Sequence, residues 1–190
     1  MIRPAKLSDA QYVMPILLQI FDEMELTALA EVSNEALSQM LIAAFKEPTY
    51  RYGYRHMLVY EDDDTNEILG LAVGYPAQLE ANIDDALAPY FQMIGLPSET
   101  RLFSNDESRP GEWYLDSLAV APHAQGRGIG SQLLSFLPEY LKKQGQSILS
   151  LSVDLKNPLA KKLYVRHGFV EDGYTMIDRH KYDHMIKRLD

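Results

Sequence analysis

The first half of the chain carries apolar side chains at helical spacing in two places. Residues 10–24 and residues 34–45 both show the spacing of an amphipathic helix, and in the second the apolar stripe is formed by Leu37, Met40, Leu41 and Ala44. Ser8 and Asp9 precede the first helix as N-cap candidates, and Pro15 inside it predicts a bend or a delayed start.

Strand patterns surround these two helices. Residues 1–5 favour a short first strand, and the apolar runs at 56–61 and 67–75 favour a hairpin, since both are rich in the side chains that suit a pleated sheet. The acidic run from Glu61 to Asp64 lies at their turn. It lacks the spacing of a calcium-binding loop, so we favour a solvated turn over a metal site.

The pattern weakens between Pro76 and Gly111. A helix is predicted over 84–95, followed by the polar, proline-containing stretch 96–111. This part of the chain is interpreted as an inserted excursion over the surface.

Regular spacing returns after Gly111. The patterns predict a strand over 112–120, a helix over 128–145, a strand over 147–153 and a helix over 158–168. This order predicts two parallel strands joined by a crossover helix, and residues 174–190 predict a closing antiparallel hairpin. We find no internal repeat and no linker, and interpret residues 1–190 as a single domain.

Composition limits the classes of protein that fit. A chain of 190 residues with 46% hydrophobic side chains suffices for a substantial core. It has no cysteine, which removes disulfides, thiolate metal sites and a cysteine nucleophile. The N-terminus lacks the features of a signal peptide, and no run of about 18 apolar residues occurs, so a cytoplasmic location is expected.

The formal net charge is −9. Such a field repels nucleic acid and anionic lipid and favours a cationic substrate. We therefore expect neither nucleic acid nor a membrane as a partner.

Three alternate glycines, Gly126, Gly128 and Gly130, separate the strand at 112–120 from the helix that follows. The helix has an apolar face of Ile129, Leu133, Leu137 and Leu141, so its N-terminus lies at the glycines. The first turn of a helix has unpaired N–H groups, and glycines let the backbone curve closely around an anion. The stretch predicts a phosphate cradle made of backbone, with a merely tight turn as the alternative.

Two common nucleotide-binding motifs do not fit this stretch. A P-loop requires Lys followed by Ser or Thr after its last glycine, whereas Gly130 is followed by Ser131 and Gln132. The dinucleotide fingerprint requires a glycine at position 131 or 133, and neither position has one.

The spacing from Gln125 to Gly130, with the strand before it, resembles the pyrophosphate-binding motif of the GNAT superfamily of N-acetyltransferases. A second signature of that family is matched downstream by Asn157, Ala160, Leu163, Tyr164, Gly168 and Phe169. The likeness is close from about Gly111 onward and extends to the first 75 residues only in element order. It implies an α/β (α+β) fold: a mixed, mostly antiparallel sheet with helices on both faces and a splayed parallel strand pair.

The resemblance implies acetyl-CoA as cosubstrate and no metal. Its pantetheine arm would pair with backbone groups of Leu118, Ala119 and Val120. The pyrophosphate would lie on backbone amides of Gly126, Arg127, Gly128, Ile129, Gly130 and Ser131, with the side chains of Gln125 and Arg127 at the rim. Asn157 would reach the pantetheine or substrate side, and it also fits an N-cap before Pro158.

The resemblance also implies catalytic roles. Tyr164 would protonate the departing CoA thiolate. A carboxylate must take a proton from the substrate ammonium, with Asp116 as first candidate and Glu112 as second. Both would share one strand face with Leu118 and Val120 if no bulge intervenes. Some relatives carry a Glu on the next strand, where this chain has Ser152.

The histidines predict no metal site. His180 and His184 lie in a strand-like segment without the His-Glu-x-x-His pattern. His167 fits a helix C-terminus, where a cation is favourable.

We therefore expect an acetyl-CoA-dependent N-acetyltransferase in which a primary amine attacks the thioester directly in a ternary complex. A non-catalytic acyl-CoA sensor or interaction module is the main alternative, and a nicotinamide-dependent oxidoreductase is a third. The acceptor side is expected among the N-terminal helices and residues 76–111, with acidic side chains at Glu23, Glu25, Asp84 and Asp85. A small amine, an antibiotic, a polyamine or a protein amino group stay open as acceptors, as does a homodimer.

Overall fold

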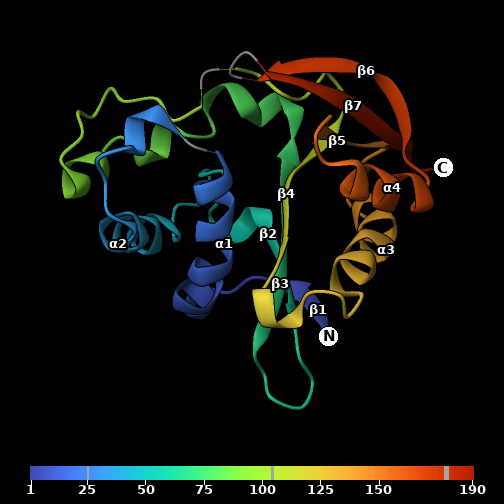
Figure 1. Cartoon of the computed structure of the whole chain (residues 1–190), viewed down its shortest axis with the longest axis horizontal. Coiled ribbons are helices and arrows are strands. Elements are labelled where there is room, and N and C mark those ends of the chain that lie inside the picture. Colours follow the sequence, from blue (N-terminus) through green and yellow to red (C-terminus); the bar gives the residue numbers. More distant parts are fainter. Residues whose placement is uncertain (25, 104, 178–179) are drawn as a thin grey trace.

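One mixed sheet organises the chain in the computed structural model, which describes residues 1–24, 26–103, 105–177 and 180–190. Its strands lie in the order β1-β2-β3-β4-β5-β7-β6 (Figure 1). They are β1 (Ile2–Pro4), β2 (Met57–Glu61), β3 (Ile68–Pro76), β4 (Trp113–Val120), β5 (Ile148–Asp154), β6 (Val170–Ile177) and β7 (His180–Arg188). All neighbours are antiparallel except β4 and β5, which are parallel. The predicted mixed, mostly antiparallel sheet is confirmed.

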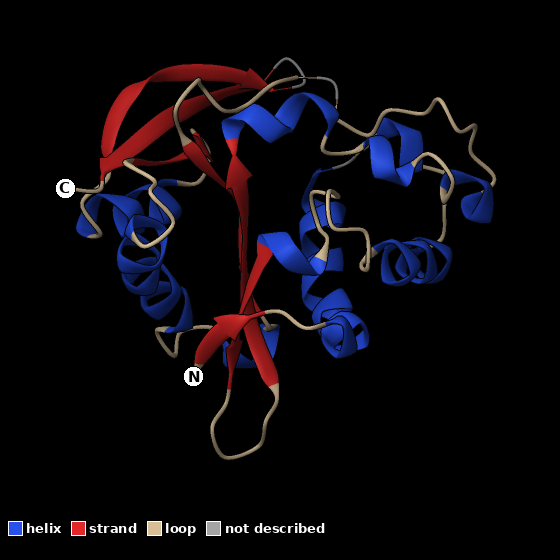
Figure 2. Ribbon diagram, turned by 180° about the vertical axis from the view of Figure 1, so that it is seen from behind, coloured by secondary structure: helices blue, strands red, loops and turns tan. Residues whose placement is uncertain are grey.

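Helices cover both faces of this sheet. Helices α1 (Ala10–Met24) and α2 (Asn34–Ala44) lie on one face, and α3 (Ile129–Lys142) and α4 (Pro158–Arg166) lie on the other (Figures 1 and 2). The apolar stripes predicted for α2 and α3 are the buried residues of those helices. The Ser33 hydroxyl caps α2 by accepting from the Ala36 amide at 3.2 Å.

The start of α1 differs from the prediction. Residues Leu7–Asp9 form a short 3-10 turn. The carboxylate of Asp9 accepts a hydrogen bond from the backbone N–H of Lys6 at 2.7 Å and forms an ion pair with Arg3 at 2.7 Å. Asp9 therefore joins the turn to β1 and does not cap α1. Pro15 lies inside the helix without delaying its start at Ala10.

The helix predicted over 84–95 is wrong. The segment after β3 instead forms the short 3-10 turns Ala77–Asn82, Asp85–Leu87 and Phe91–Ile94. Pro89 falls between the last two turns, where it removes a backbone donor and restricts the residue before it. Gly95 ends the last turn in the left-handed region, with φ of 75°.

The acidic turn between β2 and β3 is held by hydrogen bonds among its own residues. The carboxylate of Asp62 accepts hydrogen bonds from the backbone of Asp64 and Thr65, both at 3.1 Å. No cluster of potential metal ligands occurs among the residues that the structure describes. Within the same residues, no helix has the length and apolar character needed to cross a bilayer.

The closing hairpin is longer than predicted, because β6 begins at Val170. Strand β7 lies between β5 and β6, so the hairpin folds back beside the parallel pair. Of residues 179–181, where the pattern predicts the turn, residue 179 lies outside the described residues, and His180 and Lys181 belong to β7.

Candidate active site

The parallel strands β4 and β5 separate soon after they meet. Their pairing consists of Trp113 with Leu149 and Tyr114 with Ser150. Beyond these pairs β4 continues along β3 to Val120, while β5 continues along β7 to Asp154. In an antiparallel pair, alternate backbone groups point away from the partner strand. The far side of Leu118–Val120 therefore presents backbone groups to a wedge between the two strands.

The glycine-rich loop at the end of β4 leads directly into α3. Gly126 and Gly128 have φ of 75° and 80°, a region that favours glycine, and an added Cβ at either residue would meet open space. The amides of residues 126–131 donate no hydrogen bond to any described residue, and no side chain caps α3. The N-terminus of α3 thus offers unpaired N–H groups that point to a favourable place for an anion.

The side chains at the rim of this loop have partners of their own. Gln125 Nε2 donates to the Val120 carbonyl at 3.4 Å, and Arg127 lies 3.5 Å from Asp62 while more than half exposed. Asn157 caps α4 by accepting from the Ala160 amide at 3.1 Å, which confirms the predicted N-cap.

A bulge in β4 changes the predicted side-chain directions. Ser117 lies opposite Val73 and Leu115 lies opposite Gly74, so Asp116 is an extra residue in β4. Leu118 and Val120 lie against the α3 side, next to Gly130, whereas Asp116 contacts Arg51 and Tyr75. Asp116 therefore does not share a face with Leu118 and Val120, because the condition set for that prediction, a strand without a bulge, is not met.

A cavity of about 370 Å³ opens between the separating strands. Tyr114 and Asp116 line it from β4, and Ser152 and Asp154 line it from β5. Its other walls come from the end of α1, the segment before β4, the loop after β5 and the β6–β7 hairpin, and include Glu23, Phe103, Glu107, Lys156 and His180. Carboxylates outnumber cations around it, which favours a cationic ligand. The neighbouring acidic candidate Glu25 lies outside the described residues.

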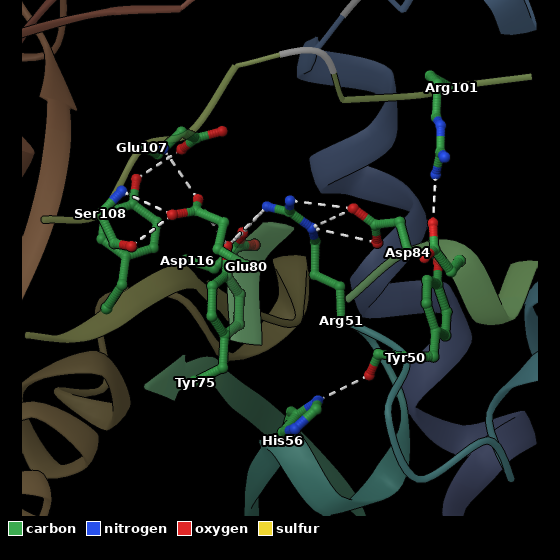
Figure 3. A network of polar contacts seen from close by, with 12 residues as sticks. Tyr50, Arg51, His56, Tyr75, Glu80, Asp84, Arg101, Glu107, Ser108 and Asp116 are labelled. Atoms are coloured by element: carbon green, nitrogen blue, oxygen red, sulfur yellow. Dashed lines mark hydrogen bonds and ion pairs between the residues drawn. The ribbon is translucent and has the colours of Figure 1, made fainter. Parts of the chain in front are cut away.

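Behind this cavity, Arg51 holds several segments together. Its side chain is 2% exposed, and its guanidinium lies 2.6 Å from Asp116 and 3.0 Å from Asp84 (Figure 3). It also donates to the Tyr75 hydroxyl at 2.8 Å and lies over the Phe103 ring. Burial opposes the charge, but the carboxylate of Asp116 and the other acidic groups raise the pKa of Arg51. Asp84 is thus part of the scaffold, while Asp85 pairs with Arg101 at the surface.

Sequence reasoning missed Glu107. Its carboxylate lines the cavity and accepts a hydrogen bond from the Tyr114 hydroxyl at 2.6 Å. Burial, reinforced by the charge of Asp116, raises the pKa of Glu107 to about 7. The residue lies in a polar stretch without periodicity, so no local pattern singles it out.

The other two candidate catalytic residues lie apart from the cavity. Glu112 is buried and lies 3.0 Å from Nε2 of His184, and it does not line the cavity. Tyr164 packs against Phe169, with ring centroids 5.8 Å apart, and burial raises its pKa to about 12. His167 differs from expectation, because burial and the charges of Lys187 and Arg166 lower its pKa and disfavour a cation there.

The match to a family model decides the relationship. Residues 18–169 match the model described as the acetyltransferase (GNAT) family. This chain belongs to that family. The predicted resemblance is therefore confirmed, together with the mixed sheet that contains one parallel strand pair.

Solved structures agree with this assignment. A crystal structure described as an acetyltransferase is 44% identical, with a TM-score of 0.90 and full coverage of both chains. An N-acetyltransferase from Staphylococcus aureus is 27% identical, with a TM-score of 0.80 over 98% of this chain and 100% of that one.

Among curated proteins, a mycothiol acetyltransferase from Stackebrandtia nassauensis is 30% identical over 82% of this GNAT chain and 44% of its own length. The chain spans less than half the length of the curated relatives that it matches.

Proposed function

We propose that the protein is an acetyl-CoA-dependent N-acetyltransferase that acetylates a primary amine by direct attack in a ternary complex. The observation that carries this proposal is the row of unpaired amides at residues 126–131 beside the wedge between β4 and β5. A diphosphate fits unpaired N–H groups at a helix N-terminus, and the open space beside Gly126 and Gly128 leaves room for it.

The chain offers residues for each part of the cosubstrate. Amides from Gly126 through Ser131 would hold the pyrophosphate, and Arg127, being largely exposed, would add positive charge at the rim after releasing Asp62. Backbone groups of Leu118, Ala119 and Val120 would pair with the pantetheine arm, and Asn157 would approach it from α4. Acetyl-CoA supplies the thioester, so no acyl-enzyme and no metal are needed.

Tyr164 is proposed as the proton donor to the departing thiolate. Its raised pKa keeps the phenol neutral at pH 7, and its hydroxyl has no hydrogen-bond partner in the part of the chain that the structure describes. The role follows from the position of Tyr164 in the second GNAT signature.

The cavity between β4 and β5 is proposed as the acceptor site. Its carboxylates Glu23, Glu107, Asp116 and Asp154 suit an amine that arrives as an ammonium ion. One of these carboxylates must take a proton before the nitrogen attacks, since only a neutral amine has a free lone pair. Asp116, the first candidate from the sequence, borders the cavity, whereas Glu112 does not.

Thiol release from acetyl-CoA tests the proposal. The wild-type protein is incubated with acetyl-CoA and a panel of propylamine, putrescine, spermidine, an aminoglycoside and a peptide with a free N-terminus, and N-acetyl products are identified by mass spectrometry. We expect thiol and acetylated amine in equal amounts for at least one acceptor. Binding of CoA by calorimetry without turnover across the panel would favour the acyl-CoA sensor, and binding of NAD in place of CoA would favour the oxidoreductase.

A further inference from the structure

The carboxylates around the acceptor cavity differ in their hydrogen bonds, and this difference bears on which of them accepts the proton. Both carboxylate oxygens of Asp116 have hydrogen-bond partners. Its Oδ2 lies 2.6 Å from Arg51 and 3.1 Å from the Tyr75 hydroxyl, and its Oδ1 accepts from the Ser117 hydroxyl at 2.8 Å. A proton on Asp116 would remove a counter-ion from a buried guanidinium, which makes Asp116 a poor acceptor.

Two further carboxylates lie at the edge of the cavity. Asp154 accepts from the backbone N–H of Lys156 at 2.8 Å and forms a local turn at the end of β5. Glu23 is exposed on the last turn of α1, where bulk water surrounds its carboxylate. Both suit attraction of a cation better than removal of a proton inside the cavity.

Glu107 has one oxygen engaged and one available. The Tyr114 hydroxyl donates to Oε2 at 2.6 Å, and no described residue donates to Oε1. The side chain is half-buried, and burial raises its pKa to about 7. A base works best when its pKa lies close to the operating pH, so Glu107 is poised for proton transfer.

The position of Glu107 is fixed although its segment has no regular structure. The carboxylate of Glu80, itself 7% exposed, accepts from the backbone N–H of Glu107 at 2.9 Å and from that of Ser108 at 3.0 Å (Figure 3). The Ser108 hydroxyl also donates to Glu80. Tyr114 holds the side chain from β4, so Glu107 is anchored at both its backbone and its carboxylate.

On the basis of the proposed function, we propose that Glu107 accepts the proton of the acceptor ammonium and that Glu80 is a positioning residue for it. The ammonium gives one proton to Glu107, and the neutral nitrogen attacks the thioester carbon. The C–N bond forms, the C–S bond breaks, and the CoA thiolate leaves with a proton from Tyr164. The second nitrogen proton returns to Tyr164 through water, and Glu107 releases its proton to solvent.

Several charged and titratable groups face Glu107, and each of them can influence the pH dependence of the rate. Asp116 and Glu80 raise its pKa, and Tyr114 and Arg51 lower it. The other titratable groups of the cavity are Glu23, Asp154, Lys156, His180 and Tyr182.

The test measures kcat/KM against pH with acetyl-CoA and the best alkylammonium acceptor of the panel, and with trifluoroethylamine, which is largely neutral near pH 7. Glu107→Gln keeps the shape and an acceptor for Tyr114, and should lower kcat/KM for the alkylammonium about 100-fold at pH 7 and remove the rise near pH 7. The loss should be much smaller with trifluoroethylamine, since that amine does not need a base before attack.

Two further variants shift the profile in opposite directions. Tyr114→Phe removes a hydrogen bond to the charged carboxylate, so the rise should move to higher pH. Glu80→Gln removes a nearby negative charge, so the rise should move to lower pH, with a smaller kcat from looser positioning. A purely structural role of either residue would leave the midpoint of the rise in place.

Asp106→Asn serves as the matched control, because this exposed neighbour does not line the cavity and should leave the profile unchanged. An active wild type with an unchanged Glu107→Gln profile overturns the assignment of Glu107 alone. Equal losses for both amines, or midpoints that do not move in Tyr114→Phe and Glu80→Gln, also overturn it. A wild type that binds CoA but acetylates no amine overturns the proposed function together with this inference.

Discussion

Nε2 of His184 on β7 lies 3.0 Å from Oε1 of Glu112, the residue immediately before β4, and both side chains are buried. The backbone N–H of Arg109 donates to the other carboxylate oxygen at 2.9 Å. This contact joins the start of β4 to β7 across β5, because Glu112 precedes Trp113, which pairs with Leu149, and His184 pairs with Ser152. We infer that Glu112 and His184 tie the start of β4 to β7, so Glu112 has a structural role.

This role predicts a loss of stability at low pH. Burial alone would raise the pKa of Glu112, but the hydrogen bonds from His184 and Arg109 outweigh it and lower the pKa below its usual range. A lowered pKa in the folded state contributes stability above the unfolded pKa of about 4.3, and that contribution is lost as the pH falls through the folded pKa. Glu112→Gln should therefore lower the free energy of unfolding by about 1–3 kcal/mol at pH 7. On acidification, the free energy of unfolding should fall less in this variant than in the wild type.

Urea unfolding at pH 7, 5 and 3.5 measures the effect. Glu139→Gln is the control, because Glu139 is an exposed carboxylate paired with Lys142 on α3 and should leave the unfolding curve unchanged. Equal stability of Glu112→Gln and the wild type at pH 7 would contradict the structural role.

Substitution of Gly128 tests the glycine cradle. Gly128→Leu introduces a side chain at φ of 80°, which costs about 1–3 kcal/mol of strain, and it places bulk where the diphosphate would lie. We expect at least a 10-fold loss of CoA affinity by calorimetry. Gly145→Leu, at the other end of α3, has φ of 77° and the same open surroundings. The control should show the same strain with unchanged CoA affinity, and equal affinities in the two variants would argue against the cradle.

Local patterns predicted much of this fold. The stripes of α2 and α3 and the strand–helix–strand order depend on neighbouring residues alone, and so do the glycine loop and the Asn157 cap. These features depend on the spacing of residues that are close in the sequence, so the sequence alone predicts them.

The acceptor side could not be predicted in this way. Arg51 binds Asp84, which is 33 residues away, and Asp116, which is 65 residues away, and neither contact leaves a periodic trace. The bulge at Asp116 depends on register with β3, where an added Cβ at Gly74 would lie 2.2 Å from the Trp113 ring. The helix over 84–95 failed because Pro89 outweighed a favourable apolar spacing.

Removal of the Arg51 guanidinium should destabilise the acceptor side strongly. Arg51→Met leaves the carboxylate of Asp116, which is 3% exposed, without its counter-ion, and breaking a buried pair costs about 3–5 kcal/mol. Urea unfolding at pH 7 measures the loss. Arg101→Met removes the exposed pair with Asp85 and should leave the curve unchanged.

A double variant separates the charge from the packing of Arg51. Arg51→Met with Asp116→Asn should cost less than the sum of the two single changes, because the neutral amide no longer needs the guanidinium. Additive costs would show that packing of Arg51 on Phe103 dominates over its pairing with Asp116.

Tyr164→Phe tests the proposed proton donor. The change removes one hydroxyl and keeps the ring against Phe169, so CoA affinity and stability should stay close to those of the wild type. Without a donor the thiolate must leave unprotonated, and kcat should fall about 100-fold. Because burial raises the pKa of Tyr164 to about 12, the wild-type rate should show no decline from this group between pH 8 and 10, where an exposed tyrosine begins to ionise. Tyr174→Phe, at an exposed position on β6, is the matched control and should retain full activity. If Tyr164→Phe keeps the wild-type kcat, the Tyr164 hydroxyl is not the proton donor, because that hydroxyl is the only group the variant lacks.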